Sequence, residues 1–201
     1  MKQITLSENV MVSDPCYTPD TWCQTKLDNV LPGLYNVEVE KSNQGDWGTR
    51  VSSITVIHED YEDMEHWGWE QHSECGVDSG QCGIFCMTSY RNDEMSESIT
   101  TPDSDFVLPY NDSEGDKWYE KMCKFTLDKQ QWGVYDTGVV SSSGIGDGLY
   151  PLEVMMDKEK IVGMRITYLG NSDEELLDEG DCCGVCGNDL EDGESCNCIN
   201  E

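Results

Sequence analysis

Leu34-Tyr35-Asn36-Val37-Glu38-Val39-Glu40 is the stretch that most clearly indicates how this chain folds. Apolar and polar residues alternate along it, so Tyr35, Val37 and Val39 share one face of a strand. The other face carries polar and charged side chains. This pattern predicts a half-buried strand with one face on a core and the other in water.

Further strand candidates lie on the C-terminal side of this stretch. Residues 51–57 have apolar side chains at both parities, which is typical of a central strand. Residues 149–156 and 161–169 flank the polar segment Asp157-Lys158-Glu159-Lys160 and predict a hairpin. The remaining strand candidates are residues 84–87, 106–108 and 132–140.

One helix is predicted over residues 115–127, where Trp118, Met122 and Phe125 recur at helical spacing. We interpret this stripe as part of the core. Together, these elements predict a β-rich α+β fold, in which residues 1–169 form a compact, mainly antiparallel sheet domain with about one helix.

The C-terminal part has a different composition. Residues 170–181, Gly-Asn-Ser-Asp-Glu-Glu-Leu-Leu-Asp-Glu-Gly-Asp, contain no basic residue and predict a solvated acidic linker. Residues 182–201 then hold five of the eleven cysteines. Clustered cysteines in a chain without an export signal favour a metal site over disulfides.

A zinc site follows from the spacing of these cysteines. Cys183-Gly184-Val185-Cys186-Gly187 has the form of a zinc knuckle, and Asp192-Gly193 predicts a turn that returns Cys196 and Cys198 to it. We expect Cys183, Cys186, Cys196 and Cys198 to bind one structural Zn²⁺. The second pair is shorter than in a usual zinc ribbon, and Cys182 competes for a place. The alternative is a disordered acidic tail with incidental or disulfide-bonded cysteines.

The other cysteines give weaker signals. Cys75, Cys82 and Cys86, with His66 and His72, allow a second metal site, but buried strand cysteines explain them better. Cys16, Cys23 and Cys123 are interpreted as packing residues. His58, His66 and His72 are interpreted as solvated loop residues, because no spacing links them to a nucleophile.

The charge of the chain narrows its range of partners. Lys and Arg total 12 against 41 Asp and Glu, a formal net charge of -29. Such a surface excludes a direct grip on nucleic acid or anionic lipid. No apolar run is long enough to span a membrane, and the first residues do not form a secretory signal. We expect a soluble, cytoplasmic protein.

Three polar turns are the candidate sites of chemistry. They lie in residues 12–17, 76–83 and 141–151. Their pocket candidates are Asp14, Asp78, Ser79, Gln81, Ser143, Asp147 and Tyr150. The third turn lacks the lysine of a phosphate loop, so its glycines favour a plain tight turn. Asp14, Asp78 and Asp147 also allow a divalent-ion site. No catalytic residue is assigned, and the chain is not expected to be an enzyme.

These turns carry a family resemblance. Asp14-Pro15-Cys16-Tyr17, Val77-Asp78-Ser79-Gly80-Gln81 and Ser143-Gly144-Ile145-Gly146-Asp147-Gly148-Leu149-Tyr150-Pro151 resemble a domain-of-unknown-function family of bacteria and tailed phages. The likeness covers about residues 10–169 and implies a compact β-rich domain with no settled activity. In that family a small residue is common at the position of Cys82, and a polar residue is frequent at the position of Cys86. This difference disfavours a metal site at Cys75, Cys82 and Cys86 that the family would share. The cysteine-rich tail, residues 182–201, looks like an addition to the family domain.

Two main functions compete. The first is a non-enzymatic acidic binding protein, a phage accessory protein that acts in the host cytoplasm on a host protein with a basic surface, including nucleic-acid mimicry or anti-defence. The second is a small-molecule-binding or hydrolysing protein whose pocket is formed by the Asp14, Asp78 and Asp147 turns. A structural or virion role is the third. Exposed edge strands would also allow two copies of the chain to pair as a homodimer.

Overall fold

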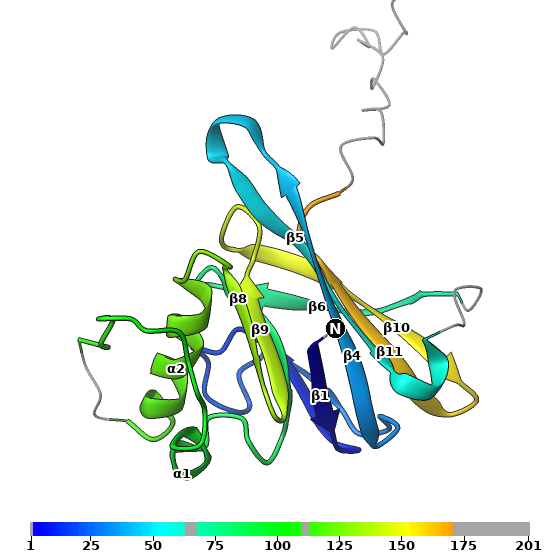
Figure 1. Cartoon of the computed structure of the whole chain (residues 1–201). Helices are drawn as coiled ribbons and strands as arrows, with labels where there is room; N and C mark the ends of the chain where they lie inside the picture. Colours follow the sequence, from blue (N-terminus) through cyan, green and yellow to red (C-terminus); the bar gives the residue numbers. More distant parts are fainter. Residues whose placement is uncertain (1, 63–67, 110–112, 171–201) are drawn as a thin grey trace, which may run out of the picture. The chain divides into compact units, whose positions relative to one another are not determined.

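The strands of this chain form two antiparallel sheets, as the computed structural model shows (Figure 1). The structure describes residues 2–62, 68–109 and 113–170. The chain divides after Leu169, and the account below concerns the part before that point. The six-stranded sheet has the order β1 (Lys2–Leu6), β4 (Gly33–Asn43), β5 (Thr49–His58), β11 (Lys160–Thr167), β10 (Gly148–Asp157) and β6 (Glu70–Val77). The five-stranded sheet has the order β3 (Thr25–Leu27), β2 (Val10–Ser13), β7 (Gln81–Cys86), β9 (Gly138–Ser142) and β8 (Trp132–Tyr135).

The predicted alternation of the first strand is confirmed in β4. Tyr35 and Val37 are buried, Val39 packs against the same core, and Glu38 and Glu40 are exposed. The partner strand β5 is central, as predicted, because it pairs with β4 on one side and β11 on the other. The β10–β11 hairpin is confirmed as well.

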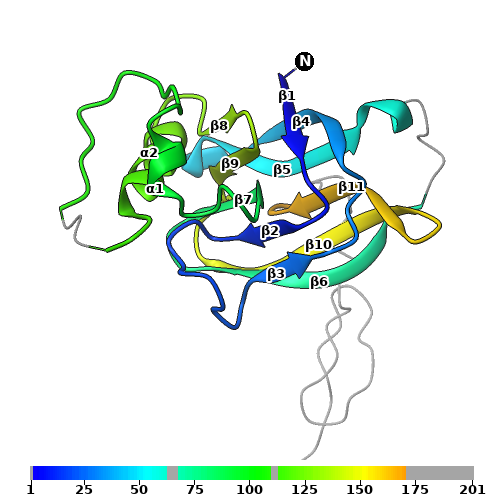
Figure 2. The same ribbon diagram turned by 90° about the horizontal axis from the view of Figure 1, so that it is seen from below.

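The main core fills the space between the two sheets (Figure 2). The five-stranded sheet contributes alternate residues to it, since Cys82, Ile84 and Cys86 of β7 all belong to this cluster. The intervening Phe85 belongs to a second cluster on the opposite face. Burial on both faces therefore explains why β7 carries no polar side chain after Gln81.

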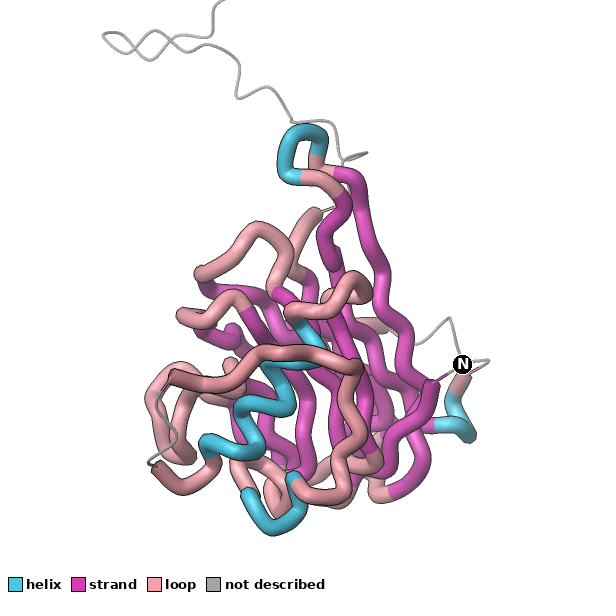
Figure 3. Tube along the Cα trace, turned by 60° about the vertical axis from the view of Figure 1, so that its left-hand side comes forward, coloured by secondary structure: helices cyan, strands magenta, loops and turns pink. Residues whose placement is uncertain are grey.

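Helix α2 (Asp116–Thr126) covers that second face (Figure 3). The predicted stripe is confirmed as core, because Trp118, Met122 and Phe125 are all buried. Trp118 meets Phe85 edge-on, with ring centroids 5.1 Å apart. Such aromatic pairs add stability beyond the apolar area that they bury. The described residues also contain the short helix α1 (Asp93–Ser96) and the 3₁₀ turns η1 (Gly45–Trp47) and η2 (Glu59–Tyr61).

Three local predictions are corrected by the structure. Residues 106–108 form no strand, because the amide of Leu108 donates to the Glu120 carboxylate of α2 and not to a neighbouring strand. Residues 132–140 form two strands, β8 and the start of β9, joined at Asp136–Thr137. His58 is not solvated: it ends β5, is buried, and lies edge-on to Tyr35 at 5.2 Å.

Some predictions fall outside the described residues. These are His66, the acidic linker beyond Gly170 and the zinc ligands Cys183, Cys186, Cys196 and Cys198. Among the described helices, none is long and apolar enough to cross a membrane.

Candidate functional site

The three polar turns meet at one end of the five-stranded sheet. β2 pairs with β7 so that Ser13 faces Gly83, and β7 pairs with β9 so that Gln81 faces Ser142. Because neighbouring strands are antiparallel, the end of β2, the start of β7 and the end of β9 lie side by side. The turns that follow or precede these ends therefore come together. We call residues 14–17, 78–80 and 143–147 the turn cluster.

Asp14 is the centre of the turn cluster. It is 0% exposed, and its carboxylate accepts four hydrogen bonds. The amides of Asp78 and Ser79 donate to one oxygen at 2.9 and 2.7 Å. The amide of Cys16 and the hydroxyl of Ser79 donate to the other oxygen at 2.8 and 2.7 Å. A buried carboxylate with this many donors holds the first two turns together.

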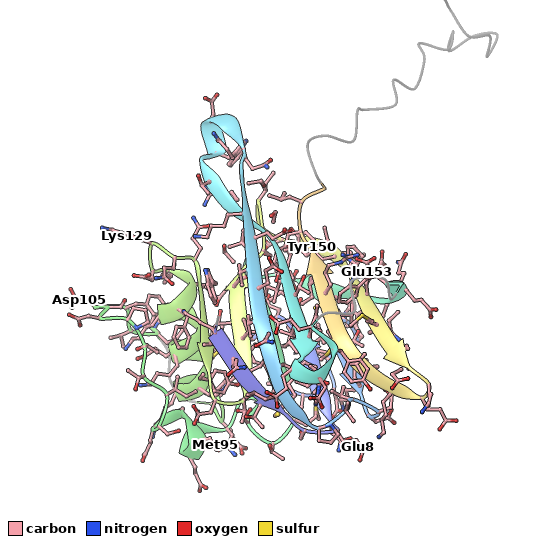
Figure 4. The ribbon with its side chains drawn as sticks, turned by 45° about the vertical axis from the view of Figure 1, so that its right-hand side comes forward. Glu8, Met95, Asp105, Lys129, Tyr150 and Glu153 are labelled. Carbon is pink, nitrogen blue, oxygen red and sulfur yellow. The ribbon has the colours of Figure 1, made fainter. Side chains whose placement is uncertain are left out.

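The third turn is joined to the second in the same way. The amide of Gly80 donates to the Asp147 carboxylate at 3.0 Å, and the amide of Ser143 donates to the Gly80 carbonyl at 3.0 Å. Within the turn, Tyr150 (labelled in Figure 4) donates its hydroxyl to the Gly146 carbonyl at 2.6 Å. Gly144 has a φ of 60°, where only glycine fits without strain. The tight turn predicted from the glycines is therefore present.

Arg91 stabilises the backbone of the first turn. It was not among the site residues predicted from the sequence. Its guanidinium donates to the carbonyls of Pro15 and Cys16, and it forms an ion pair with Asp116 at 2.9 Å. The neighbouring Tyr90 donates its hydroxyl to the Tyr17 carbonyl at 2.7 Å. These contacts link residues far apart in sequence, so no local spacing could have indicated them.

The predicted pocket residues mostly bond to one another or to nearby core residues. Ser143 donates to the Gly146 carbonyl at 2.8 Å, and the buried Gln81 accepts from Thr126 at 2.9 Å. Asp14, Ser79, Asp147 and Tyr150 are engaged as described above. Asp78 is exposed and lies close enough to Tyr17 to hydrogen-bond its hydroxyl, which helps burial raise the pKa of that tyrosine. A ligand at these positions would have to displace internal hydrogen bonds.

The surroundings of Cys16 disfavour the thiolate form of its side chain. Its side chain is half-buried in the cluster. Burial raises the pKa of the thiol well above its ordinary value, and the negative charge of Asp14 raises it further. The thiolate is the nucleophilic form, so this thiol is held in its unreactive state near neutral pH.

The two histidines that the structure describes, His58 and His72, form no catalytic pair with this cluster. His58 is buried in the six-stranded sheet, where its Nδ1 accepts from the Asp60 amide at 3.3 Å. His72 is exposed on β6. Over residues 2–62, 68–109 and 113–170, no group of three or more His, Cys, Asp and Glu side chains is placed to hold a metal ion.

A cavity of about 640 Å³ lies beside the first turn. It is lined by Thr18, Pro19, Thr88, Glu114 and residues 90–94. None of the seven predicted pocket residues contributes to its wall. The lining includes Asp93, Glu94 and Glu114, so the cavity is predominantly acidic although Arg91 lies in its wall.

The outer surface of the turns is both apolar and acidic. Trp22, in the connection that follows the first turn, is 87% exposed, and Leu149, directly after the third, is 59% exposed. Their neighbourhoods adjoin, because Gly76 lies opposite Leu149 in the β6–β10 pair and donates its amide to the carbonyl of Cys23, next to Trp22, at 3.1 Å. Asp78 and Asp147 are exposed on the same turns. We call Trp22, Leu149, Asp78 and Asp147 the turn face.

No family model, curated protein or solved structure matches this chain. The resemblance to the bacterial and phage family therefore stays a prediction from the sequence.

Proposed function

We propose that this chain is a non-enzymatic acidic binding protein that uses the turn face to bind a protein with a basic surface. One observation carries the proposal: next to internally bonded turns, Trp22 is 87% exposed and Leu149 is 59% exposed, and Asp78 and Asp147 on these turns are exposed as well. Large exposed apolar side chains on rigid loops are typical of interaction sites.

The internal bonding favours binding over catalysis. Asp14, Ser79, Ser143 and Tyr150 already satisfy one another or nearby backbone groups. The thiol of Cys16 is held protonated by burial, which raises its pKa, and by Asp14. Groups that act as acids, bases or nucleophiles must be free to reach a substrate. The same bonds make the turns rigid, which lowers the entropy cost of docking a partner.

The negative charge of the chain indicates the kind of protein that would bind the turn face. The chain has a formal net charge of -29, and the turn face adds Asp78 and Asp147 around Trp22 and Leu149. A complementary protein has lysine and arginine residues around an apolar pocket that accepts the indole ring. Opposite charges of this kind accelerate association and exclude acidic competitors. In its more specific forms, the proposal is that the chain mimics nucleic acid or that it acts on a host protein.

The test compares captured partners between matched variants. The full chain and its Trp22→Ala, Leu149→Ala and Trp47→Ala variants are immobilised, and proteins bound from cell extract at 50 mM salt are identified. Trp47 is the control because it is also strongly exposed but lies at the tip of the β4–β5 hairpin. For a captured partner, we expect Trp22→Ala to weaken binding by roughly 30-fold, the effect of losing an interface hot spot.

Salt provides the second measurement. Binding should weaken strongly between 50 and 300 mM salt, because screening shortens the reach of the carboxylates. Equal binding by the Trp22→Ala variant and the wild type, or binding that salt leaves unchanged, would contradict the proposal. Equal losses in Trp22→Ala and Trp47→Ala would show that the turn face has no special role.

The small-molecule alternative is favoured only by the convergence of the three turns. Native mass spectrometry of gently purified protein tests it directly. A retained small molecule that is lost in Asp78→Ala would favour a ligand site at the turn cluster over a protein-docking face.

A further inference from the structure

Two cysteines on either side of the second turn of the cluster, residues 78–80, face each other in the main core. The sulfur atoms of Cys75 and Cys82 are 3.3 Å apart, and both residues are 0% exposed. Cys75 lies in β6 of the six-stranded sheet, and Cys82 lies in β7 of the five-stranded sheet. The turn between them carries the amides of Asp78 and Ser79 that hold Asp14. This thiol pair therefore lies at the point where the chain passes from one sheet to the other.

The separation of these sulfurs is less than an ordinary non-bonded contact and about 1.3 Å more than a disulfide bond. Among the described residues, no metal-binding group includes these cysteines. Polar groups near the pair include the Gly76 carbonyl, 3.7 Å from the Cys75 sulfur, and the Tyr168 hydroxyl, which lies 3.2 Å from the Ser141 hydroxyl. The closing movement is short, because both cysteines flank the same connection between β6 and β7 and their sulfur atoms already face each other.

We propose that Cys75 and Cys82 are a thiol modification site that hydrogen peroxide converts into an intramolecular disulfide joining the two sheets. In the first step, one cysteine sulfur attacks a peroxide oxygen, the S–O bond forms, the O–O bond breaks and water leaves, giving a sulfenic acid. In the second step, the other sulfur attacks the sulfenic sulfur, the S–S bond forms and a second water leaves. Two thiols and one peroxide thus give one disulfide and two waters.

Burial sets the conditions of this reaction. The pKa of Cys82 is raised by burial, so the thiolate is scarce in the closed structure. The first step therefore proceeds through local opening of the β6–β7 connection, and peroxide is small enough to enter with water. Once formed, the bond is shielded from reductants by the same core. Oxidation should consequently be slow and should persist in the folded protein.

The other nearby cysteine provides a specificity control. Cys86 lies four residues beyond Cys82 on β7, which corresponds to about 13 Å along a strand. Its sulfur accepts from the Ser7 amide at 3.2 Å and lies 3.4 Å from the Thr5 carbonyl. Cys86 is therefore held at the opposite end of β7 and should remain a thiol when Cys75 and Cys82 pair.

The experiment is peptide mapping of the native full chain after peroxide treatment. The protein is unfolded, alkylated and cut before aspartate, which separates Cys75 from Cys82 at Asp78. We expect a disulfide-linked peptide pair in the wild type and in Cys86→Ser, and none in Cys82→Ser. The oxidised wild type should melt roughly 5–10 °C higher than the reduced form, because the bond closes a short loop of the unfolded chain.

Two results would overturn the proposal. One is full alkylation of Cys75 and Cys82 after peroxide treatment that oxidises the exposed Met95. The other is a linked pair that persists in Cys82→Ser and is lost in Cys86→Ser. Circular dichroism checks that each variant is folded. If Cys82→Ser does not fold, the fragment ions of the linked wild-type peptides still assign the bond to Cys82 or Cys86.

Discussion

At the scale of single residues, Asp14 has the largest structural role of any candidate group. Its buried carboxylate accepts the amides of Cys16, Asp78 and Ser79 and the hydroxyl of Ser79. In Asp14→Asn, the negative charge is lost. The new NH₂ group is itself a donor, so it cannot accept the hydrogen bonds that one carboxylate oxygen accepted. We expect the free energy of unfolding to fall by about 3 kcal/mol, because charge-assisted hydrogen bonds are replaced by unpaired buried donors. Urea unfolding followed by circular dichroism measures this loss.

Asp147 is the matched control for this substitution. It lies in the same cluster, but it is exposed and accepts one amide, that of Gly80 at 3.0 Å. Asp147→Asn should cost less than about 1 kcal/mol. Similar losses in the two variants would mean that burial of the Asp14 carboxylate does not govern the stability of the turns.

The sequence identified Asp14, Asp78 and Asp147 as a group but not their different roles. Each follows or precedes an apolar strand and stands beside glycine, serine or proline, which is typical of a turn. Only the pairing of β2, β7 and β9 decides that Asp14 points inward while Asp78 and Asp147 stay exposed. Long-range pairing of this kind is not encoded in local spacing.

At the scale of elements, strands with a clear hydrophobic pattern were predicted, whereas the edge strands β1, β3 and β6 and the short inner strand β2 were missed. The alternation in β4 and the two-faced apolar run in β5 both correspond to buried sheet positions. β6 gave no signal, because it is an edge strand and most of its first five residues, Glu70–Glu74, are polar and exposed. Polar side chains on an edge discourage pairing with other chains, so this absence of pattern has a physical cause.

The packing of α2 on β8 depends on a residue without a side chain. A Cβ atom at Gly133 would lie 2.0 Å from the ring of Phe125, a buried residue of α2. Gly133→Ala must therefore shift the helix or the ring. We expect a loss of about 2–3 kcal/mol in the free energy of unfolding, as for other overpacked cores. Chemical unfolding and the near-ultraviolet signal of the adjacent Trp118 measure it.

Gly148 is the control for this prediction. It also lies in a strand, but a Cβ there would meet nothing closer than 3.5 Å. Gly148→Ala should change stability by less than about 1 kcal/mol. If Gly133→Ala were equally mild, the close approach of Phe125 to β8 would not be required for the fold.

At the scale of the whole molecule, the charge and the turn face act together. The described ion pairs are few for 41 acidic residues, and two of them, Lys26–Asp20 and Lys160–Glu8, are exposed side-chain contacts of little energetic weight. Within residues 2–62, 68–109 and 113–170, most carboxylates form no ion pair and repel one another. A basic partner would relieve this repulsion on binding, which links the composition of the chain to the function proposed for the turn face.

The C-terminal cysteines allow a whole-molecule prediction that the sequence alone supports. Cys183, Cys186, Cys196 and Cys198 should bind one Zn²⁺ as a closed Cys₄ site. Native mass spectrometry without chelator should therefore show one zinc per chain, and a strong chelator should remove it. Because such a short segment folds only with its metal, chelation should make residues 182–201 sensitive to protease while the melting temperature of residues 1–169 stays unchanged. Cys182→Ser should retain the metal and Cys186→Ser should lose it. A folded sample without zinc, or loss of zinc in Cys182→Ser alone, would contradict the assigned ligands.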